Sequence, residues 1–144
     1  MKIRQISLFI ENRAGQLLEI TQLFAKNNID LKAINISETS DYGVLKIITD
    51  EPDRALKLLS DNEYVTGINH VVAVSVPNRP GGLSQLLETV SNAGINIEYM
   101  YSVFGQQEGM AYMIMKVNDP DKLIEVIDAA EELKTANIND LKID

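Results

Sequence analysis

The sequence contains no cysteine and no tryptophan, and its single histidine is His70. Without cysteine, the chain can form neither a disulfide framework nor a thiolate metal site, and it has no cysteine nucleophile. His70 lies in the strand-like stretch INHVVAV, and without a second imidazole a zinc hydrolase site has too few ligands. We therefore expect no catalytic residues, no metal site and no bound cofactor.

Basic residues and long apolar runs are also scarce. Thirteen Lys and Arg stand against 21 Asp and Glu, which gives a formal net charge of −8, and the basic residues form no cluster along the chain. Proteins that bind nucleic acid through its phosphates carry clustered positive charge, so we expect no nucleic-acid partner. No apolar run approaches the roughly 20 residues that span a membrane, so we expect a cytoplasmic protein without a membrane partner.

One motif, Asn-Arg-x-Gly-x-Leu, occurs twice. ENRAGQL (residues 11–17) returns as PNRPGGL (residues 77–83), 66 positions later. Farther along, EPDRALKLL (residues 51–59) matches DPDKLIEVI (residues 119–127) at an offset of 68. The two-residue difference falls between two predicted strands, around SETSDYG in the first copy and VFGQQEGM in the second, and such loops tolerate insertions. The pattern indicates an internal repeat.

Each copy predicts the same order of elements. Alternating apolar residues predict a first strand, and an apolar stripe from Leu17 or Leu83 onward predicts a helix with one buried face. Two strands, a helix that begins at Asp53 or Asp121, and a last strand around 64–69 or 137–143 complete each copy. The order βαββαβ, twice, predicts an α+β fold of two ferredoxin-like repeats, each an antiparallel sheet with both helices on one face.

No linker separates the two copies. Residues 65–76 are almost continuously β-prone, so the last strand of the first copy is predicted to run into the first strand of the second. Each copy has about 70 residues, a size at which a lone core is marginal, so we expect repeats 1–70 and 71–144 to join side by side. The stretch AYMIMKVND is apolar on both strand faces, which favours burial between the halves or in an oligomer, and we expect a homodimer.

The repeated segments resemble a known family. ENRAGQLLEITQLFAKNNIDLKAI and PNRPGGLSQLLETVSNAGINIEYM are similar to the opening of the ACT domain, a small regulatory module of amino-acid metabolism, and the βαββαβ order agrees over nearly the whole chain. The resemblance implies a tandem ACT protein. It also implies that a free amino acid binds at an interface between two ACT units and that the protein controls a partner enzyme or transcription regulator.

The repeated loop has the chemistry to hold an amino acid. A helix N-terminus offers free N–H groups and partial positive charge to an α-carboxylate. Gly15 and Gly81 let the backbone approach a ligand, although a simple turn and cap explains these glycines equally well. The side-chain amides of Asn12 and Asn78 can meet either end of an amino acid. The predicted binding residues of the two loops are Asn12, Ala14, Gly15, Gln16 and Leu17, and Asn78, Pro80, Gly81, Gly82 and Leu83.

The resemblance adds one residue at the start of the second strand of a neighbouring unit, Asp30 in the first copy and Asn96 in the second. If the repeats pair through their second strands, Asn12 would share a site with Asn96, and Asn78 with Asp30. Asp30 offers a negative charge to a ligand ammonium, whereas Asn96 offers a neutral amide. The two sites are therefore predicted to differ in affinity.

Four functional classes are compared. The leading one is a free-standing amino-acid sensor without a catalytic domain, since the two repeats account for the 144 residues. The alternative is a protein-interaction module or regulatory subunit without its own ligand. An enzyme is the weakest, because no carboxylate pair accompanies a nucleophile and no G-x-x-x-x-G-K-[ST] loop exists. An RNA-binding protein of the same fold is disfavoured by the acidic balance and by a third strand without a basic-aromatic pattern.

Overall fold

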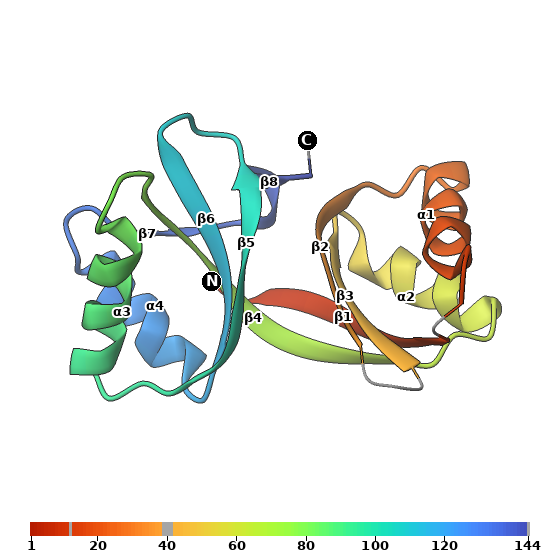
Figure 1. The fold of residues 1–144 in the computed structure, drawn as a ribbon, viewed down its shortest axis with the longest axis horizontal. Helices are drawn as coiled ribbons and strands as arrows, with labels where there is room; N and C mark the ends of the chain where they lie inside the picture. The colour runs from red at the N-terminus through yellow and green to blue at the C-terminus, as the bar shows by residue number, and fades with distance from the viewer. Residues whose placement is uncertain (12, 39–41, 144) are drawn as a thin grey trace. The chain divides into compact units, whose positions relative to one another are not determined.

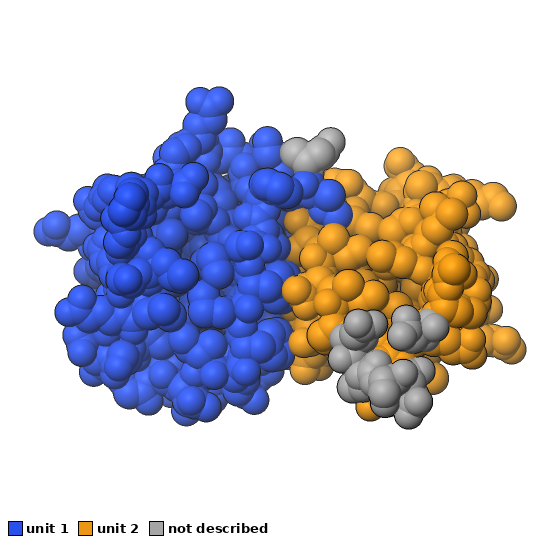
Figure 2. Space-filling model, in the orientation of Figure 1, with its two compact units in different colours: residues 1–3, 70–144 blue, residues 4–69 orange. Residues whose placement is uncertain are grey.

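The protein is described from a computed structural model that defines residues 1–11, 13–38 and 42–143 (Figure 1). It divides into two compact units, coloured separately in Figure 2. Unit 2 comprises residues 4–69, from the first copy of the repeat, and unit 1 comprises residues 1–3 and 70–144, mainly the second copy. The assignment of the repeats to 1–70 and 71–144 stays a prediction. Asn12, a predicted binding residue, lies outside the described residues.

Unit 2 is a four-stranded sheet with two helices packed on one face. Its strands have the order β2-β3-β1-β4, in which β3 pairs antiparallel with both β1 and β2. One core joins apolar residues of β1 and β3 to Phe24 of the first helix and Leu59 of the second. The elements are β1 (Ile3–Glu11), α1 (Gln16–Lys26), β2 (Leu31–Glu38), β3 (Tyr42–Thr49), α2 (Pro52–Asp61) and the first part of β4 (Thr66–Pro77).

Unit 1 repeats this arrangement. The later part of β4 pairs antiparallel with β6 and with β7, and β6 pairs with β5. The core joins Val72 and Val74 of β4 to Leu86 of α3 and Leu123 of α4. The further elements are α3 (Gly82–Asn92), β5 (Ile97–Gly105), β6 (Met110–Val117), α4 (Pro120–Asp128), β7 (Lys134–Ala136), the 3-10 turn η1 (Ile138–Asp140) and β8 (Leu141–Lys142). The predicted ferredoxin-like α+β architecture is confirmed.

The buried stripes of the first helices begin one residue earlier than predicted. In α1 the buried positions are Gln16, Ile20 and Phe24, and in α3 they are 82, 86 and 90. Leu17 is 36% exposed and Leu83 is 44% exposed, so the prediction that these leucines open the stripe was wrong. Helix α1 begins at residue 16 and α3 at residue 82, and these first residues already face the sheet. The i, i+4, i+8 spacing then places one residue per turn on the same face.

The same helices end in the same way. Asn28 and Gly94 have φ of 55° and 70°, the left-handed conformation that these residue types tolerate best. In each copy the following N–H, of Ile29 or Ile95, donates back to a helix carbonyl, at 3.0 and 3.2 Å. This geometry turns the chain sharply from the helix into the second strand.

The second helices begin before the predicted aspartates. Helix α2 starts at Pro52 and α4 at Pro120, because proline suits a first turn, where its missing N–H has no intrahelical partner. Asp119 precedes α4, and its carboxylate accepts from the N–H of Lys122 at 3.1 Å. Asp53 and Asp121 therefore lie inside the first turn instead of starting the helix.

Strand β4 runs without interruption from Thr66 to Pro77, as predicted. The single last strand predicted around 137–143 was wrong: β7 and β8 flank the turn η1 there. The Asn137 side chain accepts from the N–H of Asn139 at 2.9 Å, and the Asp140 carboxylate accepts from the N–H of Asn137 at 2.9 Å. These side chains satisfy the backbone locally and replace a strand ladder.

No helix of the described ranges is long and apolar enough to cross a membrane.

Candidate functional site

The two repeated loops have the same backbone conformation. Gly15 precedes α1 with φ 85° and ψ −10°, and Gly81 precedes α3 with φ 89° and ψ −10°. Residues with a Cβ are strained at such positive φ, whereas glycine is not. A Cβ added at either glycine would meet no other atom within 4 Å, so the requirement for glycine comes from the backbone angle and not from crowding.

Matching hydrogen bonds hold both loops. The N–H of Arg13 donates to the Glu11 carbonyl at 2.9 Å, and the N–H of Arg79 donates to the Pro77 carbonyl at 3.0 Å. One turn later, the carbonyls of Gly15 and Gly81 each accept an N–H at 3.0 Å. No described residue accepts a hydrogen bond from the intervening first-turn N–H groups, which belong to Leu17, Leu18, Leu83 and Ser84. Each helix therefore presents free N–H groups and partial positive charge, which suit an anion such as a carboxylate.

The side chains around the two loops differ at the residue that begins the helix. Gly82 is buried, and a Cβ there would lie 2.2 Å from the Pro77 carbonyl oxygen, so only glycine fits. The matching residue Gln16 carries a side chain that is 6% exposed, and its Nε2 donates to the Tyr64 hydroxyl at 3.2 Å. The loop of unit 2 thus has a buried amide where the loop of unit 1 has a close backbone contact.

The loop arginines have different partners. Arg13 donates to Glu19 at 3.1 Å and to Glu11 at 3.2 Å, and its hydrogen bond to Glu19 raises the pKa of its guanidinium. Arg79 instead donates to Glu132, which follows α4. These side chains are about half exposed, so we expect the pairs to orient the arginines more than to stabilise the fold.

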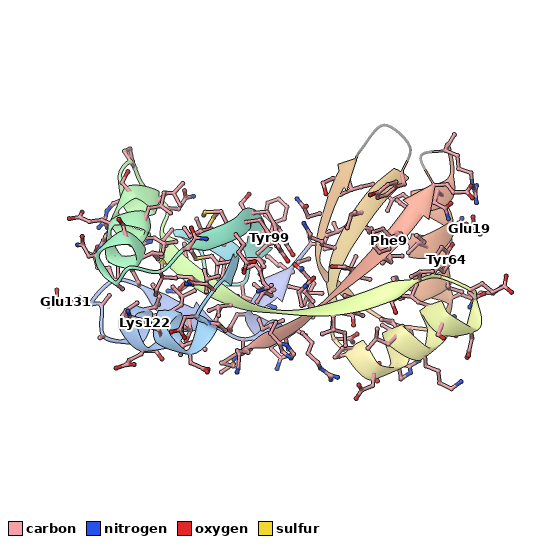
Figure 3. All side chains as sticks on the ribbon, turned by 90° about the horizontal axis from the view of Figure 1, so that it is seen from below. Phe9, Glu19, Tyr64, Tyr99, Lys122 and Glu131 are labelled. Atoms are coloured by element: carbon pink, nitrogen blue, oxygen red, sulfur yellow. The ribbon has the colours of Figure 1, made fainter. Side chains whose placement is uncertain are left out.

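A pocket of about 360 Å³ lies beside the loop of unit 2. Figure 3 shows Glu19 and Tyr64 at this end of the unit. Burial raises the pKa of Tyr64, and the nearby negative charge of Glu19 raises it further, so this hydroxyl stays protonated at neutral pH. The lining residues are Phe9, Ile10, Glu11, Arg13, Gln16, Glu19, Asn62, Glu63, Tyr64 and Val65.

A smaller hollow of about 80 Å³ opens at the same loop, between the start of α1 and the strands β2 and β3. It is lined by Ile10, Glu11, Arg13, Gln16, Leu17, Ile36 and Gly43. Water occupies about 30 Å³ per molecule in the liquid, so this hollow has room for only a few waters. It contains Gln16 and Leu17, two of the residues predicted to bind a ligand.

Asp30 and Asn96 occupy equivalent places in the two units. The N–H of Asp30 donates to the Asp50 carboxylate at 3.0 Å, and the N–H of Asn96 donates to the Asn118 side-chain oxygen at 3.0 Å. In return, the N–H groups of Asp50 and Asn118 donate to the carbonyls of Asp30 and Asn96, at 3.1 and 3.2 Å. These bonds join the start of the second strand to the end of the third.

Within each unit the predicted site residues fall into two separate groups. The loop follows the end of β1, which pairs with Tyr42 at the start of β3, whereas Asp30 precedes Leu31, which pairs with Thr49 at the other end of β3. Asp30 therefore does not reach the loop of its own unit, and the same register in β5 and β6 separates Asn96 from its loop. The predicted pairings of Asn12 with Asn96 and of Asn78 with Asp30 stay predictions.

The other predicted residues lie on exposed parts of the loops. Asn78 is exposed, its N–H donates to the Gly109 carbonyl at 2.9 Å, and its side chain makes no hydrogen bond to a described residue. Ala14 and Pro80 are exposed as well. In the part of the chain that the structure describes, no three His, Asp or Glu side chains gather into a potential metal site. Sequence reasoning missed Tyr64 and Glu19, whose roles depend on a contact between distant segments.

Comparison with known families gives one match that covers nearly the whole chain. A family model described as an ACT domain pair matches residues 1–142. No curated protein matches the chain.

Solved structures with a similar fold are numerous. A protein of Bacteroides thetaiotaomicron shares 39% identity over 97% of this chain and 95% of its own, with a TM-score of 0.89. The ligand-free regulatory subunit of aspartate kinase from Thermus thermophilus shares 17% identity over 90% of this chain and 93% of its own, with a TM-score of 0.67. The corresponding subunit from Thermus flavus has 16% identity, coverage of 88% and 90%, and a TM-score of 0.60. At such low identity these two subunits support the fold alone.

Proposed function

The chain belongs to the family of ACT domain pairs, which are regulatory and not catalytic modules, and from this premise we propose that it binds a free amino acid through its two repeated loops. The observation that carries the proposal is the matched geometry of the loops: a glycine at φ 85° or 89°, followed by a helix whose first N–H groups lack a partner among the described residues. The α-carboxylate of the ligand would accept from these N–H groups.

The exposed amide of Asn78 supports the same proposal. It can donate to a ligand carboxylate or accept from a ligand ammonium, and no described residue occupies it. Asn12 would do the same in the other loop. We further propose that a neighbouring ACT repeat completes each site with Asp30 or Asn96, and that the protein acts as a homodimer that regulates an enzyme or a transcription regulator. These proposals rest on the family resemblance.

A thermal-melt screen of the purified chain against the common amino acids, each at millimolar concentration, tests the proposal. A ligand at 100 times its Kd adds about 2.7 kcal/mol to the free energy of unfolding, which corresponds to a shift of several degrees for a chain of this size. We expect one or a few amino acids to raise the midpoint, and calorimetry to give a Kd in the micromolar to millimolar range, about −8 to −4 kcal/mol.

Two variants decide whether the loops are responsible. Asn78→Ala is expected to weaken binding, whereas Asn92→Ala, which removes an exposed amide at the far end of α3, is expected to leave it unchanged. If no amino acid shifts the midpoint of the unmodified chain, the loops are structural turns. The protein would then be better described as an interaction module without its own ligand.

A further inference from the structure

Near the C-terminus, residues 132–142 form a strap that joins two edges of the unit 1 sheet (Figure 1). Its strand β7 pairs with β4 and its strand β8 pairs with β5, and β4 and β5 lie on opposite sides of β6. The turn η1 carries the chain from one edge to the other. The first copy continues through β4 directly into the second, so the described part of unit 2 contains no such strap.

The first part of the strap lies beside the loop of unit 1. The guanidinium of Arg79 donates to the Glu132 carboxylate. Strand β7 pairs with the strand that leads into the loop, so that Lys134 lies opposite Ser75, whose hydroxyl donates to the Lys134 carbonyl at 3.5 Å. The side chains of Arg79 and Glu132 are about half exposed, so their ion pair contributes little stability by itself.

The second part of the strap holds the hairpin of residues 105–109, which joins β5 to β6. The N–H of Gln106 donates to the Asp140 carbonyl at 2.9 Å, and the Gln106 Nε2 donates to the Asn139 carbonyl at 3.3 Å. Gly105 pairs with Leu141, whose side chain is fully buried. The hairpin is therefore bonded to the strap through both main chain and side chain.

The hairpin in turn holds the loop. Its Gly109 carbonyl accepts, at 2.9 Å, from the N–H of Asn78, the residue whose side-chain amide the proposed amino-acid site uses. The ring of Tyr112 packs so closely on Gly105 that a Cβ there would lie 2.0 Å from a ring atom. The Tyr112 hydroxyl also accepts from the N–H of Gln107 at 3.3 Å. This buried ring stiffens the hairpin between its contact with the strap and its contact with the loop.

We propose that the strap holds the loop of unit 1 in its ligand-binding conformation, and that opening of the strap loosens the loop and lowers its affinity. Short segments with few backbone hydrogen bonds open locally before a domain unfolds, and β8 has only two residues. By linkage, a ligand that favours the ordered loop also favours the closed strap. The change in affinity rests on the proposed function, whereas the link between strap and loop does not.

Amide hydrogen exchange of the full chain, measured without ligand, tests the link. Asp140→Ala removes the carboxylate that holds η1 by accepting from the N–H of Asn137 at 2.9 Å. We expect exchange at Gln106 and Asn78 to become about fivefold faster, the effect of losing one net hydrogen bond. The N–H of Arg13 makes the corresponding turn bond in unit 2 and is expected to change by less than about twofold.

Asp119→Ala is the matched control. The Asp119 carboxylate also accepts a backbone N–H, that of Lys122 at 3.1 Å, and it follows the end of β6 that is remote from the hairpin. We expect this variant to leave exchange at Asn78 unchanged. Gln106→Ala approaches the link from the hairpin, because it removes the side-chain bond to the strap and leaves η1 intact. It should also speed exchange at Asn78, by a smaller factor.

The exchange rates decide the proposal. Faster exchange at both Gln106 and Asn78 in Asp140→Ala, but not in Asp119→Ala, supports it. Unchanged exchange at Asn78 overturns it, whatever happens at Gln106, since the strap would then not hold the loop. Equal acceleration by both aspartate variants also overturns it, because the loss would be general to unit 1. Should Asp140→Ala fail to fold, the rate at Asn78 in Gln106→Ala decides in the same way.

The affinity is tested separately with any amino acid that the thermal-melt screen identifies. We expect Asp140→Ala to weaken binding at the loop of unit 1 about fivefold and Asp119→Ala to leave it unchanged. Unchanged affinity in a variant whose loop exchanges faster would overturn the regulatory part of the proposal. If no amino acid binds, the proposed function fails, and the exchange rates still show whether the strap holds the loop.

Discussion

In unit 2 the first helical residue after the loop is Gln16, whose buried side chain reaches Tyr64. In unit 1 the same position is Gly82, and the Pro77 carbonyl occupies the space that a side chain would need. The backbones of the two loops nevertheless agree, from the angles of Gly15 and Gly81 to the hydrogen bonds around them. The loop conformation is thus common to both copies, and its surroundings are specific to each.

This difference bears on ligand binding. The sequence predicted unequal sites from Asp30 and Asn96, and the structure adds a second source of inequality close to the loops themselves. Gln16 places an amide and a pocket next to one helix N-terminus, whereas the other has a tight backbone contact. If both loops bind the same amino acid, we expect their affinities to differ even where their backbone N–H groups are equivalent.

The largest effect is expected from Gly82→Ala. The added Cβ would lie 2.2 Å from a backbone oxygen that cannot rotate away, so we expect a loss of about 1 to 3 kcal/mol in the free energy of unfolding. Gly67→Ala is the control, because a Cβ at Gly67 meets nothing within 4 Å and its φ is not in the left-handed region. Urea denaturation of both variants makes the comparison. Equal costs at Gly82 and Gly67 would contradict the close contact.

The second-largest loss of stability is expected at the loop glycines, and it should be the same in both units. Gly15→Ala and Gly81→Ala place an alanine in the left-handed conformation, which costs about 1 to 2 kcal/mol for a residue with a Cβ. Asparagine tolerates this conformation better, so Gly15→Asn and Gly81→Asn should each cost less than alanine. Denaturation curves of the four variants measure these costs. A large difference between the two units would mean that the loops are not equivalent in solution.

The third-largest loss of stability is expected from a hydrogen bond in unit 2. Tyr64→Phe removes the hydroxyl that accepts from Gln16, and we expect a loss of about 0.5 to 1.5 kcal/mol, the usual net value of one hydrogen bond. Tyr112→Phe is a comparison in unit 1, since its hydroxyl accepts from the N–H of Gln107 at 3.3 Å. If Tyr64→Phe proves as stable as the unmodified chain at neutral pH, the Gln16 contact contributes nothing.

The pH dependence of stability provides a further test at Tyr64. Burial and Glu19 raise the pKa of this hydroxyl, so the folded state holds the proton more tightly than the unfolded chain. The resulting stabilisation is present in full below the unfolded value of about 10 and is lost as the pH rises through the folded pKa. Stability of the unmodified chain should therefore fall more steeply above pH 10 than that of Tyr64→Phe. Parallel curves, measured by urea denaturation across this range, would contradict the shift.

Much of the fold could be predicted from the sequence because the helices and strands follow simple hydrophobic periods. The repeat, the order βαββαβ and the uninterrupted β4 all follow from local patterns. The broken last strand could not be predicted in this way. Its cause is a pair of side chains, Asn137 and Asp140, that bond to nearby backbone, and such residues allow either a turn or an exposed strand position.

The candidate site was only partly predictable for a related reason. The glycines of both loops could be recognised from their repetition, since their role is set by the local backbone. The contact between Gln16 and Tyr64 joins residues 48 positions apart, and it depends on how α1 and the connection after α2 pack on the sheet. Nothing in the sequence near either residue marks this contact, which is why the pocket was missed.

The smallest effects are expected where the two units use different side chains for the same bond. The Asp50 carboxylate and the Asn118 amide oxygen each accept the N–H that opens the second strand, at 3.0 Å in both units. The exchange variants Asp50→Asn and Asn118→Asp keep this acceptor, so each should change the free energy of unfolding by less than about 0.5 kcal/mol. Asp50→Ala and Asn118→Ala remove it and should each cost about 1 kcal/mol. Denaturation of the four variants tests the equivalence of the two strand ends. A costly exchange at one position alone would mean that the charge of Asp50, and not its geometry, holds the start of the second strand in unit 2.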